Sequence, residues 1–215
     1  MFIALEGIDG SGKSTQMQFI VEWLETHGVA SKSILVTREH TYDGEYGKRI
    51  QRILLGEEAH FPTPRDLQEL YVYDRKEHLE KTILPHLAKG GVVVCDRYFL
   101  STIAYGGAGG VDYEDIMTMH RNILGKSFIM PDVTFLIDVS AETSATRLIG
   151  RKKDRKPEYF DKKKAFLAKA AAEYRKRAQL FENIHIINGE GSPKEVFSRI
   201  RQILTSQLSP CTKQS

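Results

Sequence analysis

Residues Gly7-Ile8-Asp9-Gly10-Ser11-Gly12-Lys13-Ser14 match, without a gap, the pattern of a glycine, four further residues and then Gly-Lys-Ser/Thr. The apolar run of residues 1–5 before them is typical of a buried strand, and the residues from 12 onward carry apolar side chains at helical spacing. Strand, loop and helix in this order are the setting of a phosphate-binding loop. The alternative is a glycine-rich turn before an ordinary helix, which the flanking pattern disfavours.

Each residue type in this loop has a physical reason. Glycines let the backbone bend around a phosphate and bring its N–H groups close to it, at the positive end of a helix. Lys13 supplies a charge that can follow the β and γ phosphates, and the Ser14 hydroxyl is placed to bind the Mg²⁺ that bridges them. We therefore expect ATP with Mg²⁺ to bind at Gly7, Ile8, Asp9, Gly10, Ser11, Gly12, Lys13, Ser14 and Thr15.

Length and composition favour one domain. The chain has 215 residues, and we expect a single kinase domain over residues 1–208 with a frayed tail over residues 209–215. Its two cysteines, Cys95 and Cys211, give no disulfide framework and indicate a reducing compartment. The sequence has no signal-peptide pattern and no apolar run long enough to span a membrane. We expect a cytoplasmic protein with no membrane partner.

The net charge of +3 is mild, but basic residues gather in one segment. Residues 147–177 contain thirteen Lys and Arg against four Asp and Glu. For most of these lysines a solvated helix face is the better interpretation. A nucleic-acid surface is a weaker alternative, and we expect no nucleic-acid partner. Residues 151–156 could instead form a cationic flap over an anionic substrate.

Further apolar runs predict four more strands, at residues 33–38, 92–95, 133–139 and 184–187. Because these runs alternate with helical patterns, we expect an α/β fold with a five-stranded parallel sheet covered by helices on both faces. Ligands bind such a sheet at the carboxyl ends of its strands. The polar residues expected at those ends are Asp9, Arg38, Asp96 and Arg97.

The predicted helices carry distinct signals at their ends. Thr63-Pro64-Arg65-Asp66 begins a long helix that runs to residue 87, where Pro85 should bend or frame the last turn. Residues 98–105 are helical and lead into a flexible glycine cluster at residues 106–110. An alanine-rich helix is expected from about 162 to 181. Ser192-Pro193-Lys194-Glu195 forms a capping box before the last helix.

Two features favour a kinase over other proteins with this loop. Asp96 ends a buried strand where a carboxylate can hold Mg²⁺, directly or through water, and Arg97 follows it and places a guanidinium beside the transferring phosphate. The basic residues 151–156 lie between two helices, where a closing flap would stabilise transition-state charge and exclude water. A GTPase would need an Asn-Lys-x-Asp sequence to recognise guanine, and this sequence is absent.

The chain resembles the thymidylate (dTMP) kinases, with their P-loop nucleoside monophosphate kinase fold, over nearly its whole length. The resemblance rests on Phe2-Ile3-Ala4-Leu5-Glu6-Gly7, Thr37-Arg38-Glu39, Tyr71-x-x-Asp74-Arg75, Asp96-Arg97-Tyr98-x-x-Ser101-x-x-Ala104-Tyr105, Pro131-Asp132-Val133-Thr134-Phe135 and a basic lid at about 150–158. The Asp-Arg-Tyr to Ala-Tyr stretch is the most specific part. The resemblance also implies a homodimer.

The resemblance implies roles for individual residues. Asp9 would approach the deoxyribose 3′-hydroxyl or the acceptor phosphate with its Mg²⁺, and Arg75 and Arg97 would hold that phosphate. Tyr71 would stack on the thymine. The remaining pocket residues would be Arg38, Ser101 and Thr102 around base and sugar, and Tyr105 where a 2′-hydroxyl would go.

The family supplies cations to the transferring phosphate either from the loop or from the lid. Gly10 stands where some members carry an arginine, so Arg151 and Arg155 of the lid would join Lys13, Asp9 and Arg97 in catalysis. Three positions depart from the family pattern around the acceptor: Tyr71 replaces Phe, His40 replaces Pro, and Gly106 replaces a frequent Gln or Thr.

We therefore predict ATP-dependent phosphorylation of dTMP to dTDP. One alternative is a kinase for another deoxynucleoside monophosphate, such as dUMP. A different class is an ATP-dependent regulatory module that transfers to no acceptor.

Overall fold

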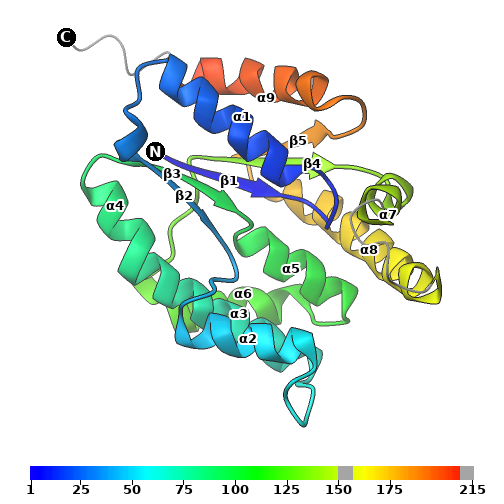
Figure 1. The fold of residues 1–215 in the computed structure, drawn as a ribbon. Coiled ribbons are helices and arrows are strands. Elements are labelled where there is room, and N and C mark those ends of the chain that lie inside the picture. The colour runs from blue at the N-terminus through cyan, green and yellow to red at the C-terminus, as the bar shows by residue number, and fades with distance from the viewer. Residues whose placement is uncertain (150–156, 209–215) are drawn as a thin grey trace.

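The computed structural model describes residues 1–149 and 157–208, and these form a five-stranded parallel sheet with strand order β2-β3-β1-β4-β5 (Figure 1). The strands are β1 (Phe2–Glu6), β2 (Ile34–Arg38), β3 (Val92–Asp96), β4 (Val133–Asp138) and β5 (Ile184–Asn188). Every predicted strand is present within a residue or so of its expected ends. The predicted fold class is confirmed.

Helices alternate with these strands. They are α1 (Lys13–Thr26), α2 (Glu45–Leu55), α3 (Pro64–His78), α4 (Leu84–Ala88), α5 (Phe99–Ala108), α6 (Tyr113–Leu124), α7 (Ala141–Ile149), α8 (Pro157–Ala178) and α9 (Pro193–Leu208). The predicted caps are confirmed: Thr63 Oγ1 accepts from the Asp66 N–H at 3.2 Å, and the Ser192 N–H donates to Glu195 Oε2 at 2.7 Å.

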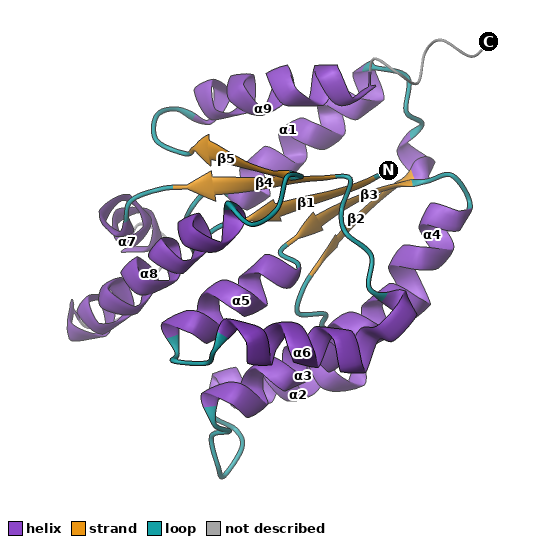
Figure 2. Cartoon of the chain, turned by 180° about the vertical axis from the view of Figure 1, so that it is seen from behind, coloured by secondary structure: helices purple, strands orange, loops and turns teal. Residues whose placement is uncertain are grey.

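Two apolar layers hold helices to the sheet (Figures 1 and 2). On one face, Ile3 and Leu5 of β1 pack with side chains of α1 and α9. On the other face, Phe2 and Ala4 pack with side chains of α5, α6 and α8. The central strands are therefore buried on both faces, which is why they read as unbroken apolar runs instead of alternating ones.

The strand register places three strand ends side by side. Asp96 at the end of β3 pairs with Leu5 of β1 and with Arg38 of β2. The phosphate loop begins directly after Glu6. The expected gathering of polar residues at the carboxyl edge of the sheet is therefore confirmed by the strand pairing.

The single long helix predicted for residues 63–87 is interrupted. Residues Leu79–Ile83 form a π-helical turn between α3 and α4. Pro85 explains this break, because proline donates no hydrogen bond and its ring crowds the carbonyl four residues earlier. A π turn widens the helix at that point.

The prediction of a flexible glycine cluster is wrong for Gly106 and Gly107, which lie inside α5. The reason is tertiary packing: a Cβ on Gly106 would lie 2.6 Å from Ile116 Cδ1 on α6. Glycine at this position lets α5 approach α6 closely. Helix α8 also differs from expectation, since it begins at residue 157, with proline at its first position, and ends at residue 178.

Within the described parts of the chain, every helix is too short or too polar to cross a membrane.

Candidate active site

The phosphate loop is shaped by glycines that no other residue could replace without strain. Gly7 has φ +136° and Gly10 has φ +77°. A Cβ on Gly7 would lie 2.5 Å from the Ile137 carbonyl oxygen, and one on Gly10 would lie 2.8 Å from the Ser144 carbonyl oxygen. The backbone of α7 therefore packs directly on the loop at Gly10. This contact explains why the loop carries no side chain there.

Two residues of α7 anchor the loop from outside. Ser144 Oγ donates to the Asp9 carbonyl at 2.6 Å. Arg147 donates to the carbonyls of Ser11 and Gly189, each at 3.2 Å, and so ties the loop to the segment after β5. The sequence analysis identified neither residue. Arg147 is one basic residue among many in its segment, so nothing distinguished it from the others.

Lys13 lies beneath the loop. Its Nζ donates to the carbonyls of Gly7 at 3.0 Å and Ile8 at 3.1 Å. Burial, and next the charge of Arg97, lowers the pKa of Lys13 to about 8. The ammonium is therefore charged at neutral pH. The next residue, Ser14, is exposed to solvent.

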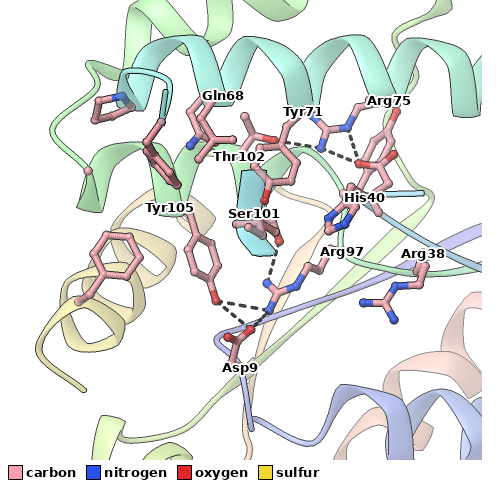
Figure 3. A pocket seen from close by; sticks show the side chains of 18 residues that line it. Asp9, Arg38, His40, Gln68, Tyr71, Arg75, Arg97, Ser101, Thr102 and Tyr105 are labelled. Carbon is pink, nitrogen blue, oxygen red and sulfur yellow. Dashed lines mark hydrogen bonds and ion pairs between the residues drawn. The ribbon is translucent and has the colours of Figure 1, made fainter. Parts of the chain in front are cut away.

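Arg97 joins the phosphate loop to the neighbouring cavity (Figure 3). Its guanidinium donates to the Gly7 carbonyl at 3.0 Å, to Asp9 Oδ1 at 2.7 Å and to the Tyr105 hydroxyl at 3.3 Å. Its backbone has φ +72°, the left-handed region that non-glycine residues rarely adopt. Such a conformation costs on the order of 1–3 kcal/mol and clusters at functional sites.

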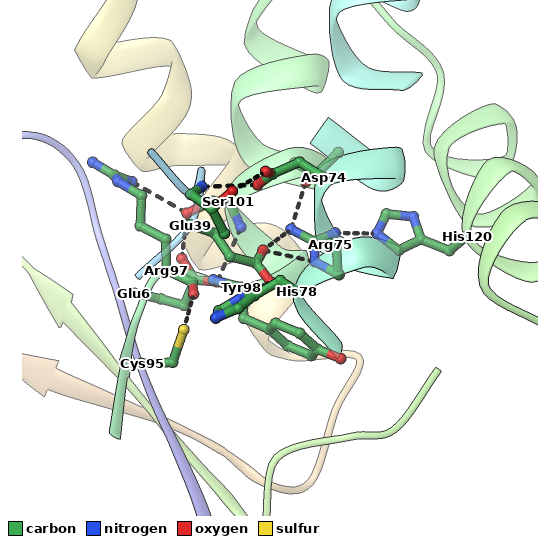
Figure 4. Close-up of polar contacts among 12 residues, drawn as sticks. Glu6, Glu39, Asp74, Arg75, His78, Cys95, Arg97, Tyr98, Ser101 and His120 are labelled. Carbon is green, nitrogen blue, oxygen red and sulfur yellow. Dashed lines mark hydrogen bonds and ion pairs between the residues drawn. The ribbon is translucent and has the colours of Figure 1, made fainter. Parts of the chain in front are cut away.

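The buried carboxylate of Glu6 holds this arginine in place indirectly (Figure 4). It accepts hydrogen bonds from the N–H groups of Tyr98 at 2.8 Å and Ser101 at 3.1 Å, at the start of α5. It also accepts from the hydroxyls of Ser101 and Tyr174, at 2.5 Å and 3.0 Å. Both hydroxyl oxygens in turn accept from Arg97, each at 3.1 Å.

Burial raises the pKa of Glu6, and its hydrogen bonds and the charge of Arg97 act in the opposite direction. Sequence reasoning gave Glu6 no role. The available signal was a charged residue at the end of an otherwise apolar strand, since a buried carboxylate needs partners.

Arg75 lies in a second buried cluster, with Glu39 and His120 (Figure 4) and with Thr102 (Figure 3). Its Nε donates to Glu39 Oε2 at 2.8 Å, and Nη2 lies 2.6 Å from the same oxygen. Nη2 also donates to Thr102 Oγ1 at 3.0 Å, and Nη1 to His120 Nε2 at 2.6 Å. Partners within the described residues therefore occupy most of the guanidinium's five N–H donors.

The charges in this cluster are fixed by their contacts. Burial raises the pKa of Glu39, but the charge of Arg75 and the hydrogen bond from His78 outweigh burial and hold that pKa below its usual value. His120 Nδ1 lies 2.7 Å from the Ile116 carbonyl, so Nδ1 carries the proton and Nε2 accepts from Arg75. Burial, followed by the Arg75 charge, lowers the pKa of His120 to about 3.

A cavity of about 500 Å³ opens beside Arg97, between α2, α3, α5 and α8 (Figure 3). It brings together every residue predicted to contact the acceptor nucleotide: Asp9, Arg38, Tyr71, Arg75, Arg97, Ser101, Thr102 and Tyr105. Its wall also contains residues that sequence reasoning did not assign, namely Glu39, Leu54, Phe61, Pro64, Leu67, Gln68, Tyr98, Gly109 and Phe166. A volume of this size suits a small ligand.

Arg38 and His40 lie together in the cavity wall. The Arg38 guanidinium lies over the Tyr42 ring, 4.7 Å from its centroid, whereas Glu39 pairs with Arg75 and His78. Among the described residues, Glu39 is therefore paired with side chains of α3 and not with Arg38. Burial, and next Arg38, lowers the pKa of His40 to about 4, so His40 is neutral at pH 7.

Asp96, the predicted Mg²⁺ ligand, is not among the residues that line the cavity. Asp96 ends β3 beside the phosphate loop, and its Oδ1 is buried without a hydrogen-bond partner in the described part of the chain. Arg151 and Arg155 of the lid lie outside the described residues.

A phosphate loop and a nucleotide-sized cavity that meet at one arginine define a P-loop kinase acting on a small acceptor. The sequence model for thymidylate kinase matches residues 5–200. The chain is 36% identical to the probable thymidylate kinase of Thermococcus kodakarensis, over 97% of this chain and 98% of the relative. It therefore belongs to the thymidylate kinase family, and its reaction is the ATP-dependent phosphorylation of dTMP to dTDP.

Further comparisons agree. The thymidylate kinase of Thermosipho africanus is 36% identical, over 97% of this chain and 99% of that one. The crystal structure of thymidylate kinase from Ehrlichia chaffeensis matches with a TM-score of 0.73 at 25% identity, covering 95% of this chain and 98% of that chain. The family resemblance predicted from the motifs is confirmed.

The neutral state of His120 predicts a pH dependence of stability. Below about pH 6.5 the unfolded chain takes up a proton at His120 that the folded chain excludes until about pH 3. The free energy of unfolding should therefore fall as pH falls through this window, with a contribution of up to about 1.4 kcal/mol per pH unit. The free energy of unfolding, measured with urea between pH 7 and pH 4.5, should fall less steeply with falling pH for His120→Gln than for the wild type. The matched control is His60→Gln, at an exposed position. An equal pH dependence of the free energy of unfolding in all three proteins would contradict the neutral state of His120.

Proposed function

We propose that ATP binds at the phosphate loop, that dTMP binds in the 500 Å³ cavity, and that transfer occurs where Asp9 and Arg97 meet. The observation that carries this proposal is the position of Arg97, which contacts the Gly7 carbonyl of the loop and also lines the cavity. A phosphate at the mouth of the cavity would therefore lie within reach of the donor site. Catalysis is then mainly positioning and electrostatic stabilisation.

We propose that Arg97 is the main residue that binds the acceptor phosphate. Its guanidinium reaches the loop edge of the cavity, where it faces Asp9 and Tyr105. Arg75 is less suited to this role than the family resemblance implies, because it is fully buried and most of its donors already bind Glu39, His120 and Thr102. We propose that Arg75 instead forms the wall behind the base.

Tyr71 would stack on the thymine ring from α3. Burial raises the pKa of Tyr71 to about 12, so its hydroxyl stays protonated and can donate a hydrogen bond. Arg38, Ser101 and Thr102 would line base and sugar. Tyr105, whose hydroxyl lies near Asp9 Oδ1 at 3.4 Å, would pack where a ribose 2′-hydroxyl would have to fit.

Magnesium is the cofactor that fits these residues. Asp96 Oδ1, which has no partner among the described residues, lies beside the phosphate loop, and the Ser14 hydroxyl at the end of the loop is exposed; oxygen ligands of this kind are what Mg²⁺ prefers. When bound, Mg²⁺ neutralises charge on the β and γ phosphates. Ser14 would bind it directly, and Asp96 directly or through water.

The substrate assignment is tested by ADP release across dTMP, dUMP, dCMP, dAMP and dGMP. We expect dTMP to give the highest kcat/KM, and Lys13→Ala to abolish turnover without unfolding the chain, because Lys13 is the loop cation that reaches the phosphates. A higher kcat/KM for dUMP would favour the alternative acceptor. ATP hydrolysis that no nucleoside monophosphate stimulates would favour the regulatory module.

The lid should supply the remaining positive charge. Because Gly10 leaves no room for a side chain in the loop, we propose that Arg151 and Arg155 neutralise the transferring phosphoryl group. Arg151→Ala or Arg155→Ala should lower kcat by about 10²-fold or more, with a smaller effect on the affinity for dTMP. Lys169→Ala, exposed on α8, is the matched control. Normal turnover in both single variants and in the double variant would mean that the basic run is only a solvated face.

We further propose that residues 1–208 act as one kinase domain and that the protein is a homodimer. Support comes from the family resemblance and from exposed apolar residues such as Leu55 on α2, which is 67% exposed. Sedimentation equilibrium should give twice the mass of the chain, since burying such residues between two copies is favourable. A single-chain mass at micromolar concentration would contradict this.

A further inference from the structure

Gln68 is a buried polar residue to which nothing so far gives a role. It lies on α3, is 5% exposed and lines the acceptor cavity. Its Oε1 is buried and has no hydrogen-bond partner among the described residues. Buried polar atoms in native proteins are nearly always paired, and an unpaired one is costly. An unpaired amide oxygen in the wall of a cavity therefore points to a ligand that pairs with it.

Its place on α3 puts it beside the predicted base site. Gln68 precedes Tyr71 by three residues and Arg75 by seven, so the three share one face of the helix. Gln68 and Tyr71 line the same cavity, whose wall also contains Thr102 of α5 (Figure 3). A ring stacked on Tyr71 would therefore present its edge within reach of residues on this helix face.

Gly106 of α5 makes room for this side chain. A Cβ on Gly106 would lie 3.0 Å from Gln68 Cγ and 3.4 Å from Gln68 Cδ. The space that a side chain at position 106 of α5 would use is therefore filled by Gln68 from α3.

We propose that Gln68 is a specificity-determining residue whose carboxamide hydrogen-bonds the imide edge of the pyrimidine, an inference that rests on the proposed binding of dTMP in this cavity. Oε1 accepts the N3–H of thymine, and Nε2 donates to a neighbouring ring carbonyl. A carboxamide carries one acceptor and one donor side by side, which matches this edge.

This arrangement recognises the imide edge of the pyrimidine and not the part of the ring in which thymine and uracil differ. Uracil has the same imide edge as thymine, so Gln68 does not distinguish dTMP from dUMP. N3-methylthymine has a methyl group in place of the N3 hydrogen. This base leaves the buried Oε1 unpaired, and a site built to pair a polar group rejects ligands that cannot pair with it.

The test compares wild-type protein, Gln68→Leu and Gln68→Met, which removes the amide at nearly constant length. Each is assayed with dTMP, dUMP and the 5′-monophosphate of N3-methylthymidine. We expect KM for dTMP and dUMP to rise about tenfold in both variants, with a smaller change in kcat and no change in KM for ATP. The wild-type preference for dTMP over the N3-methyl analogue should shrink by a similar factor, while the dTMP to dUMP ratio stays constant.

Gln202→Leu, exposed on α9, is the matched control and should behave as wild type. Calorimetric binding of dTMP to each variant separates affinity from turnover, and circular dichroism confirms that each is folded. An unchanged preference against the N3-methyl analogue in either folded variant overturns the assignment of Gln68. Failure of the wild-type protein to phosphorylate dTMP would instead overturn the proposed function, so the two failures are distinguishable.

Discussion

The arrangement of this site depends on one buried carboxylate. Glu6 ends the central strand, where water cannot solvate it, and the N–H groups at the start of α5 and the Tyr174 hydroxyl of α8 replace that water. These contacts join β1, α5 and α8 at the point where the phosphate loop begins. Through Ser101 and Tyr174 they also fix the Arg97 guanidinium. Leaving such donors unpaired would cost about 1–3 kcal/mol each, so sheet, helix and arginine are set together.

Much of this architecture could be predicted because its signals are local. The phosphate loop is contiguous in sequence, and strands buried on both faces are apolar throughout, so their positions are evident without any tertiary information. Of the residues gathered around the cavity, Asp9, Arg38 and Arg97 could be predicted from their places at the strand ends, and the others only through the family resemblance. Tyr71 and Thr102, for example, lie on different helices, and no spacing in the sequence relates them.

The remainder could not be predicted because it arises from contacts between distant segments. One example is the buried cluster of Arg75, Glu39 and His120, which come from three separate segments of the chain. Each side chain can be buried only because the others satisfy its charge or its hydrogen bonds. The continuation of α5 through Gly106 depends on Ile116 of α6 in the same way. Local propensity disfavours glycine in a helix, but close packing overrides it here.

The charged residues around the cavity are not evenly balanced along its length. At the base end Glu39 cancels the charge of Arg75, and His120 carries none. At the loop end two of the lining residues, Arg38 and Arg97, are positive and one, Asp9, is negative, while behind them the charge of Lys13 is opposed by Asp96 and Glu6. The uncompensated guanidinium charge that faces the cavity is therefore at its loop end, and low-dielectric walls strengthen the field of such a charge. A mononucleotide would enter with its phosphate toward the loop and its uncharged base toward the far end, an orientation set by the electrostatic field of the lining residues.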